Sequence, residues 1–178
     1  MSAATEFSRP VRLDELGGEP RVMTIAADEG ERAALAHRFD LIAIATLEAD
    51  ARLHRDGPLV LATGRLRAVA TQSCVATGEP VPARIDEPFA LRFEPPTEGR
   101  PEELELDEGD LDVIVYEGSA VDLGEAVAQG FALALDPFPR IADADAFLRA
   151  AGVVTEEEAE AARVEASPFA GLKGLGKD

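Results

Sequence analysis

The chain has 178 residues, of which 46% are hydrophobic and 29% charged, and its formal net charge at pH 7 is -18. This length fits one domain, and the composition is that of a folded, soluble protein rather than of a disordered one. The longest mainly apolar run, residues 41–47, is far shorter than the roughly 20 residues that span a bilayer, so we expect no membrane contact. The first ten residues lack the pattern of a secretory signal, and a single cysteine cannot form an internal disulfide, which together indicate the cytoplasm.

The acidic residues are concentrated in the second half of the chain. Residues 1–93 contain 14 acidic and 11 basic side chains, whereas residues 94–178 contain 21 acidic and 6 basic ones, a net charge of -15. Such a surface repels nucleic-acid phosphates at long range and attracts basic proteins, although acidity also serves solubility alone. The charge therefore favours a basic protein partner, and we expect no DNA binding.

The first forty residues predict two strands and a helix. Residues 7–13 and 21–25 alternate between apolar and polar side chains, and glycines and a proline separate them. Asp28 and Glu31 form a capping-box pattern in front of an apolar stripe. This pattern predicts a helix over residues 29–38.

A long hairpin over residues 41–75 is the clearest structural prediction. Two alternating runs flank Asp56-Gly57, a dipeptide that tolerates the positive φ of a two-residue type I′ turn. One face of the hairpin is then apolar and the other charged, so the register is expected to be firm. The pairs that this register sets opposite each other include Arg55 with Pro58, Leu53 with Val60, Ile44 with Val69 and Glu48 with Arg65.

Further elements follow the hairpin. A tight turn at residues 77–80 leads into a strand that ends at Phe93, and a long acidic loop with a short strand at residues 104–106 comes next. Residues 111–116 predict another strand.

The main helix is expected over residues 123–135. Asp122 is its predicted N-cap, Glu125 completes a capping box, and the two prolines of residues 136–140 end it. Beyond it, residues 144–151 predict a short helix, and a second capping box begins an acidic one. The residues of that box are Thr155 and Glu158.

These elements predict an α+β fold. We expect a curved or partly closed antiparallel sheet of about six to seven strands, with the main helix and one short helix packed on it, and an acidic C-terminal tail. We therefore divide the chain into a domain over residues 1–140 and a helical or flexible extension over residues 141–178.

Two separated segments resemble the YceD family, whose bacterial members are associated with accumulation of large-subunit ribosomal RNA. One is residues 72–81, QSCVATGEPV, and the other is residues 122–140, which end in an Asp-Pro-aromatic-Pro-Arg step. Residues 35–41 are similar more weakly, and the end of the chain resembles the ends of family members. The residues that carry the motifs are Cys74, Glu79, Pro80, Asp136, Pro137, Pro139 and Arg140.

The resemblance implies a non-catalytic factor that supports large-subunit ribosomal RNA accumulation or ribosome assembly. One mechanism is binding of a basic ribosomal protein or assembly factor, and the alternative is direct contact with ribosomal RNA. Candidate contacts for the basic partner are Glu102, Glu103, Glu105, Asp107 and Glu108. Candidate contacts for RNA or a partner are Arg52, Arg65 and Arg67 on the polar hairpin face, although pairing with neighbouring acids is the simpler role for these arginines. A candidate docking tail consists of Pro168, Phe169, Leu172 and Lys173.

No catalytic or metal-ligand constellation is apparent in the sequence. Cys74 is expected to be a small buried side chain, because neither His37 nor His54 is predicted near it and zinc requires about four ligands. Neither histidine has the serine and carboxylate of a triad, and no glycine-rich phosphate loop is present. We therefore expect neither an enzyme nor a cofactor, and a metal-binding or hydrolytic protein is the weakest alternative.

Overall fold

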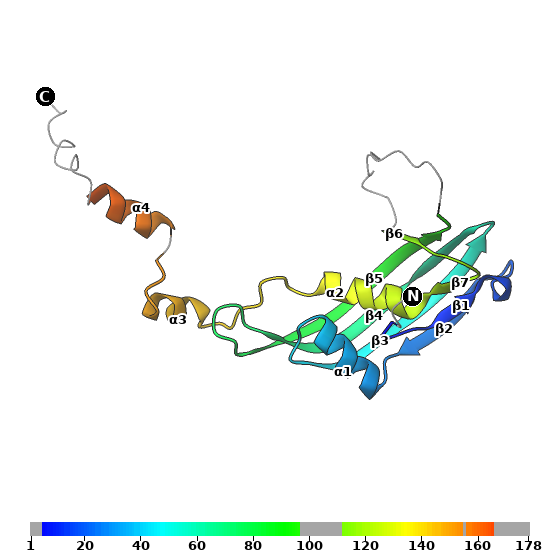
Figure 1. Cartoon of the computed structure of the whole chain (residues 1–178), viewed down its shortest axis with the longest axis horizontal. Helices are drawn as coiled ribbons and strands as arrows, with labels where there is room; N and C mark the ends of the chain where they lie inside the picture. Colours follow the sequence, from blue (N-terminus) through cyan, green and yellow to red (C-terminus); the bar gives the residue numbers. More distant parts are fainter. Residues whose placement is uncertain (1–4, 97–111, 155, 166–178) are drawn as a thin grey trace, which may run out of the picture.

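The computed structural model describes residues 5–96, 112–154 and 156–165. Within them the chain forms an α+β fold, as predicted: an open five-stranded sheet in the order β2-β3-β4-β5-β6, a two-stranded sheet of β1 and β7, and helices (Figure 1). The strands are β1 (Pro10–Arg12), β2 (Arg21–Ala26), β3 (Ala43–Asp56), β4 (Leu59–Ser73), β5 (Pro80–Glu94), β6 (Asp112–Val115) and β7 (Ala120–Asp122). The helical segments are η1 (Leu13–Glu15), α1 (Glu29–Arg38), α2 (Leu123–Ala134), α3 (Ala144–Ala150) and α4 (Glu156–Glu165).

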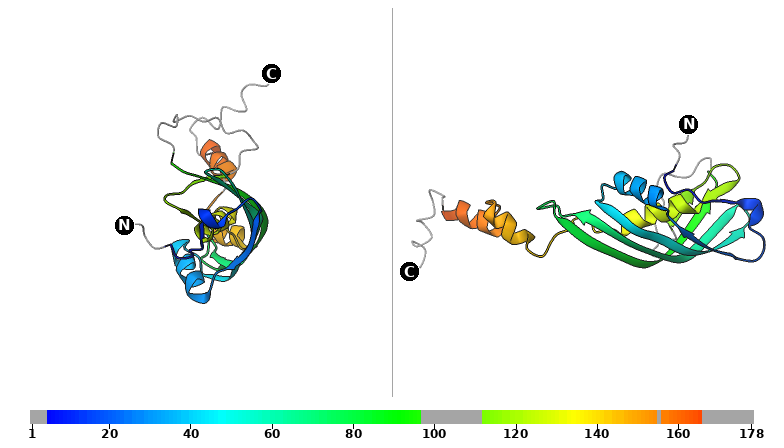
Figure 2. Two further views of the ribbon diagram at one scale, coloured as in Figure 1. Left: turned by 90° about the vertical axis from the view of Figure 1, so that its right-hand side faces the viewer. Right: turned by 90° about the horizontal axis from the view of Figure 1, so that it is seen from below.

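The core lies between the concave face of the sheet and helix α2. Figure 2 shows the long strands curving around α2, so that alternate residues of β3, β4 and β5 face the helix. Burial of one large apolar side chain stabilises such a fold by roughly 1.5 to 3 kcal/mol. The largest fully buried side chains include Phe7, Leu35, Leu47, Leu53, Phe93, Leu123 and Phe131.

The sheet is mixed rather than wholly antiparallel. The predicted strand after the acidic loop exists as β6, but it pairs with β5 in parallel, Leu91 lying opposite Asp112. A parallel neighbour requires a connection of a dozen or more residues that returns the chain to the same end of the sheet. The segment between β5 and β6, residues 95–111, is long enough for that return. The short strand predicted at residues 104–106 lies outside the described residues.

Strands β3 and β4 form the predicted hairpin, but the predicted register was wrong by two residues. Asp56 lies opposite Leu59, so the turn is Gly57-Pro58 rather than Asp56-Gly57. The φ of Gly57 is 58°, and a proline ring holds the next φ near -65°, a combination that fits a type II′ turn. Since the shift is even, the side chains from Thr46 to Asp56 keep their predicted faces, whereas an irregularity between Ile44 and Thr46 places Ile44 in the core.

The shift changes which residues face each other across the hairpin. Glu48 lies opposite Arg67 rather than Arg65, and Arg65 lies opposite Asp50. Near the open end, the register shifts again between Ile44 and Thr46. The pairs that replace the predicted ones include Arg55 with Val60, Leu53 with Ala62, Ala43 with Thr71, Ile44 with Ala70 and Thr46 with Val69.

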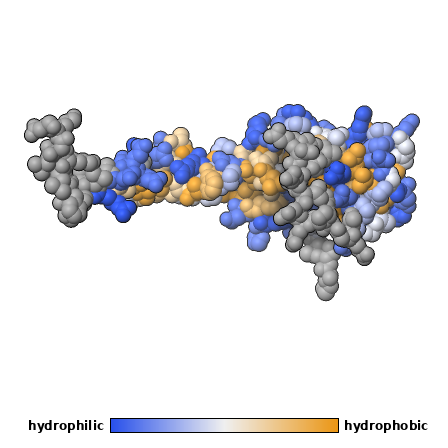
Figure 3. All heavy atoms as spheres, turned by 90° about the horizontal axis from the view of Figure 1, so that it is seen from above, coloured by the Kyte–Doolittle hydropathy of each residue, from blue (hydrophilic) through white to orange (hydrophobic). Residues whose placement is uncertain are grey.

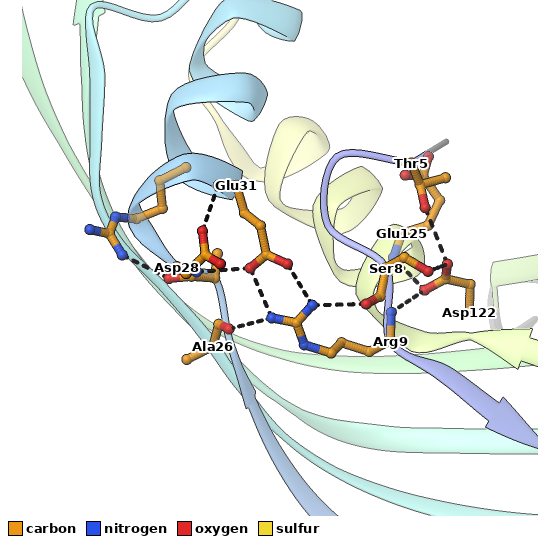
Figure 4. Close-up of polar contacts among 10 residues, drawn as sticks. Thr5, Ser8, Arg9, Ala26, Asp28, Glu31, Asp122 and Glu125 are labelled. Atoms are coloured by element: carbon orange, nitrogen blue, oxygen red, sulfur yellow. Dashed lines mark hydrogen bonds and ion pairs between the residues drawn. The ribbon is translucent and has the colours of Figure 1, made fainter. Parts of the chain in front are cut away.

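Helix α1 begins at the predicted cap and is tied to the N-terminal segment. The Asp28 carboxylate accepts from the main-chain N of Glu31, and the Glu31 carboxylate accepts from the main-chain N of Asp28, both at 2.8 Å. Figure 4 shows that Arg9 joins this cap: its guanidinium donates to both oxygens of Glu31, at 2.6 and 2.8 Å, and to the carbonyl of Ala26. The Arg9 hydrogen bond lowers the pKa of Glu31 below its usual range.

Helix α2 begins at Asp122, also as predicted, and the same carboxylate holds the N-terminal segment. It accepts from the main-chain N of Glu125 at 3.1 Å, from that of Arg9 at 2.8 Å and from the Ser8 hydroxyl at 2.5 Å (Figure 4). The capping box predicted here is incomplete, because the Glu125 carboxylate does not return to the main-chain N of Asp122 and instead pairs with Arg38 of α1 at 2.8 Å. Just before α2, the unpredicted strand β7 pairs with β1, which covers only residues 10–12 of the strand predicted over residues 7–13.

Helices α3 and α4 lie beyond the end of the sheet (Figure 1). Helix α3 corresponds to the helix predicted over residues 144–151, and α4 begins where an acidic helix was expected. Thr155, the first residue of the predicted capping box, lies outside the described residues. The division of the chain at residue 140 stays a prediction.

Candidate functional site

The two segments that carry the family resemblance are distant in sequence and adjacent in the structure. The side-chain amide of Gln72 donates to the main-chain carbonyl of Asp136 at 2.8 Å. The main-chain N of Val75 donates to the carbonyl of Pro139 at 2.9 Å. These bonds join the end of β4 to the segment that follows α2, and we call this region the motif junction.

The turn between β4 and β5 forms one half of the motif junction. The main-chain N of Cys74 donates to the Glu79 carbonyl and that of Gly78 to the Cys74 carbonyl, each at 2.8 Å. Gly78 has a φ of 75°, a conformation that glycine adopts without strain. Glu79 and Pro80 are exposed, and Pro80 is the first residue of β5. The turn is therefore fixed mainly by its own backbone.

The segment after α2 forms the other half. The Asp136 carboxylate accepts from the main-chain N of Phe138 at 2.8 Å, and prolines on both sides of Phe138 restrict the backbone. Pro139 is buried, whereas Asp136, Pro137 and Arg140 are exposed. This arrangement ends α2 and presents the Phe138 ring to solvent, 71% exposed.

Cys74 lies inside the motif junction and is buried, as expected, with 3% exposure. The Thr77 hydroxyl, followed by main-chain N–H groups that include that of Ile141, lowers the pKa of the thiol to about 7. His54 lies near the opposite end of β4, across from Leu61. Within the described residues, no three histidine, cysteine or carboxylate side chains are grouped as metal ligands.

An open groove of about 490 Å³ borders the motif junction. It lies between the C-terminal ends of α1, β4 and α2, and the Phe39 ring in its wall contacts the buried Phe131 ring at 6.0 Å between centroids. Residues of its wall include Phe39, Asp40, Leu41, Gln72, Val75 and Leu133. Figure 3 shows hydrophobic residues on the surface where the extension leaves the sheet.

The candidate arginines share the outer, convex face of the hairpin, but two of them are already paired. Arg65 donates to Asp86 at 2.5 Å, and Arg67 donates to Glu48 at 2.9 Å and to Asp50 at 2.5 Å. The Thr24 hydroxyl and then Arg67 lower the pKa of Asp50, while Arg65 lowers that of Asp86. These contacts neutralise much of the positive charge on that face.

Arg52 differs from the other two arginines. It is exposed on the same face, and within the part of the chain that the structure describes no carboxylate pairs with it. The remaining candidates lie outside the described residues: the acidic run of Glu102, Glu103, Glu105, Asp107 and Glu108, and the tail of Pro168, Phe169, Leu172 and Lys173.

Sequence reasoning missed the residues that give the groove its surface. Leu133 near the end of α2 is 83% exposed, although β4 continues past the end of this helix, where Gln72 donates to the Asp136 carbonyl. Asp40 has a positive φ of 53°, which only the helix end itself could have suggested. The Asp-Pro-Phe-Pro-Arg step was noted for its resemblance, but not for the exposure of its aromatic ring.

No helix in the described ranges is long and apolar enough to cross a membrane. No curated protein and no solved structure matches the chain. The model of a family described as "Large ribosomal RNA subunit accumulation protein YceD" matches residues 62–176, which include both halves of the motif junction. The name of the family implies a role in the accumulation of large-subunit ribosomal RNA, and the chain belongs to this YceD family.

Proposed function

We propose that the protein supports large-subunit ribosomal RNA accumulation in the cytoplasm as a non-catalytic factor that binds a basic ribosomal protein or assembly factor. The pairing of the hairpin arginines is the observation that carries this choice of partner. Arg65 and Arg67 donate to carboxylates of their own sheet, so phosphate groups would have to compete with Asp86, Glu48 and Asp50. The net charge of -15 in residues 94–178 supports the same choice, since it repels RNA and attracts cationic proteins.

Direct binding of ribosomal RNA is the second candidate, and the exposed, unpaired Arg52 in the described part of the hairpin favours it. Arginine side chains on a sheet bind RNA backbones, usually with aromatic side chains that stack on bases. On this face the positions next to Arg52 are Val22 on β2 and Thr63 on β4. An RNA contact here would therefore rest on charge rather than on stacking.

A capture experiment separates the two mechanisms. The full-length protein is immobilised on a resin and incubated with cell lysate, with and without RNase, and the bound ribosomal proteins are quantified. Protein contact predicts retention after RNase. The acidic run is then neutralised by changing Glu102, Glu103, Glu105, Asp107 and Glu108 to Gln or Asn, which should lower capture in a salt-dependent way while stability barely moves.

A control variant makes the same charge change elsewhere. It neutralises five exposed acids outside the acidic run: Glu19, Asp56, Glu87, Glu117 and Asp143. This variant should capture the partner almost as well as the wild type if the acidic run is the contact. Two results together would establish the RNA mechanism instead. The variant with the neutralised acidic run would capture ribosomal proteins at the wild-type level in low salt, and the Arg65→Ala plus Arg67→Ala variant would capture none.

A further inference from the structure

Large apolar side chains are exposed together around the groove at the motif junction. Val75 and Leu133 line the groove and are 54% and 83% exposed. Phe138 lies between two prolines that line the groove and is 71% exposed. Soluble proteins seldom expose so many large apolar groups at one place unless a partner covers them.

The polar groups of the groove wall favour a cationic partner. The only ionisable side chains in its described wall are the carboxylates of Asp40 and Asp136, and no arginine, lysine or histidine accompanies them. Gln72 is 7% exposed as a residue, and within the described residues no hydrogen bond reaches its side-chain oxygen, so this oxygen can accept from a donor that enters the groove.

Asp40 holds a position that usually belongs to glycine. Helix α1 ends in a Schellman arrangement, in which Leu41 N donates to the Ala36 carbonyl at 2.8 Å and Asp40 N donates to the His37 carbonyl at 3.4 Å. In this arrangement Asp40 has a positive φ of 53°, a backbone conformation that is strained for a residue with a side chain. The chain thus carries a carboxylate at the groove although the backbone there favours glycine.

We propose that this groove binds an extended segment of a basic protein, with an apolar side chain against Val75 and Leu133 and a lysine or arginine beside Asp40. A second copy is a poorer occupant, because each copy carries a net charge of -18 and the two would repel. This inference takes from the proposed function only that the partner is a basic protein. It assigns to the groove a second contact, in addition to the one proposed for the acidic run.

Two pairs of matched variants test the assignment. Asp40→Asn removes the charge while keeping a residue that tolerates positive φ, and Glu117→Gln removes an equivalent exposed charge on the connection between β6 and β7. Val75→Thr replaces a methyl group by a hydroxyl at the groove. Val115→Thr makes the same change on β6, where the valine is also 54% exposed.

The probe is a library of random 12-residue peptides displayed on phage and selected on the full-length protein. Enriched peptides should combine a large apolar residue with a neighbouring lysine or arginine. When they are synthesised, Asp40→Asn should weaken their Kd about two- to fivefold, the range for one exposed ion pair. Val75→Thr should weaken it about three- to tenfold, through loss of an apolar contact, and the two control variants should not change it.

Several outcomes would overturn the proposal. These are enrichment of no peptide, enrichment of basic peptides without apolar residues, and equal weakening by groove and control variants. If a synthetic peptide of residues 166–178 binds as tightly as the selected peptides, the occupant is the chain's own C-terminal end. If the wild type forms a dimer that Val75→Thr abolishes, the occupant is a second copy. If groove variants weaken peptide binding but lysate capture yields no ribosomal protein, the groove proposal stands and the proposed function fails.

Discussion

At the scale of single residues, the surroundings of Cys74 make its thiol unusually acidic. Hydrogen bonds from the Thr77 hydroxyl and from nearby main-chain N–H groups favour the thiolate and lower its pKa from 9.0 to about 7. Because the folded pKa lies below that of the unfolded chain, the thiolate stabilises the fold fully above about pH 9. This contribution is lost as the pH falls through 7.

Thr77→Val removes the hydroxyl donor and should raise the pKa of Cys74 toward its ordinary value. Titration of the thiolate by ultraviolet absorbance measures this shift in the folded protein. Cys74→Ser should show no thiolate signal and a flatter dependence of unfolding free energy on pH between 7 and 9. An unchanged pKa in Thr77→Val would show that the main-chain donors suffice.

Gly64 on β4 lies where the backbone of β3 and the ring of Phe89 leave no room for a side chain. A Cβ at this position would overlap the main-chain oxygen of Asp50 and lie 2.7 Å from Cζ of Phe89. Gly64→Ala should therefore lower the free energy of unfolding by about 1 to 3 kcal/mol in a denaturant titration. Gly18→Ala is the control, since nothing lies within 4 Å of the place that its new methyl group would take, and it should leave stability nearly unchanged.

At the scale of elements, one carboxylate, that of Asp122, joins helix α2 to the N-terminal segment. It caps α2 and accepts from Arg9 and Ser8 of the N-terminal segment. Asp122→Ala should lower the free energy of unfolding by about 1 to 2 kcal/mol, as loss of a working N-cap does. Asp143→Ala is the matched control, because Asp143 precedes α3 without making a side-chain cap bond. Equal effects of the two changes would contradict the capping role.

The hairpin register makes a prediction about charge coupling. In a double-mutant cycle, Glu48 and Arg67 should show a favourable coupling that decreases in high salt, because Nε of Arg67 lies 2.9 Å from Oε1 of Glu48. The corresponding cycle on Glu48 and Arg65 should show a weaker coupling, because Arg65 pairs with Asp86 on the neighbouring strand β5. Stronger coupling to Arg65 in solution would restore the register that the sequence predicts.

Local signals predicted the helix starts well, whereas long-range pairing was harder to predict. Capping at Asp28 and Asp122 depends on residues three positions apart, so the sequence contains the whole interaction. The hairpin contains two dipeptides that fit a two-residue turn, Asp56-Gly57 and Gly57-Pro58, and sequence alone did not choose between them. Parallel pairing of β6 depends on where a long connection returns, which no local pattern encodes.

The candidate site was predictable only in part, for a related reason. Resemblance identified Cys74 and the segment after α2 separately, but hydrogen bonds across 64 positions, such as that from Gln72 to Asp136, are visible only in three dimensions. Exposure of Leu133 likewise depends on which elements cover each side of α2. A helical pattern shows that a residue is apolar, but not whether another element covers it.

At the scale of the whole molecule, we propose that the C-terminal extension is separable from the sheet domain. Among the described side chains of residues 144–165, only Ala144 is buried. A chain that ends at Asp143 keeps the Ile141 main-chain donor to Cys74 and should unfold cooperatively with a Tm within a few degrees of the full chain. Loss of cooperative unfolding, followed by circular dichroism and calorimetry, would place the domain boundary later.

The pairing of β1 with β7 joins residues 10–12 to residues 120–122, near opposite ends of the sheet domain. The β3–β4–β5 meander is local in sequence and can form early, whereas the β1–β7 pairing spans the largest sequence separation of any strand pair in the described fold, so we expect it to form later. During synthesis, the N-terminal segment must wait for β7 to be made. Until then Phe7 and Val11, which are fully buried in the finished fold, stay exposed to water and to the chaperones and proteases that meet a nascent chain.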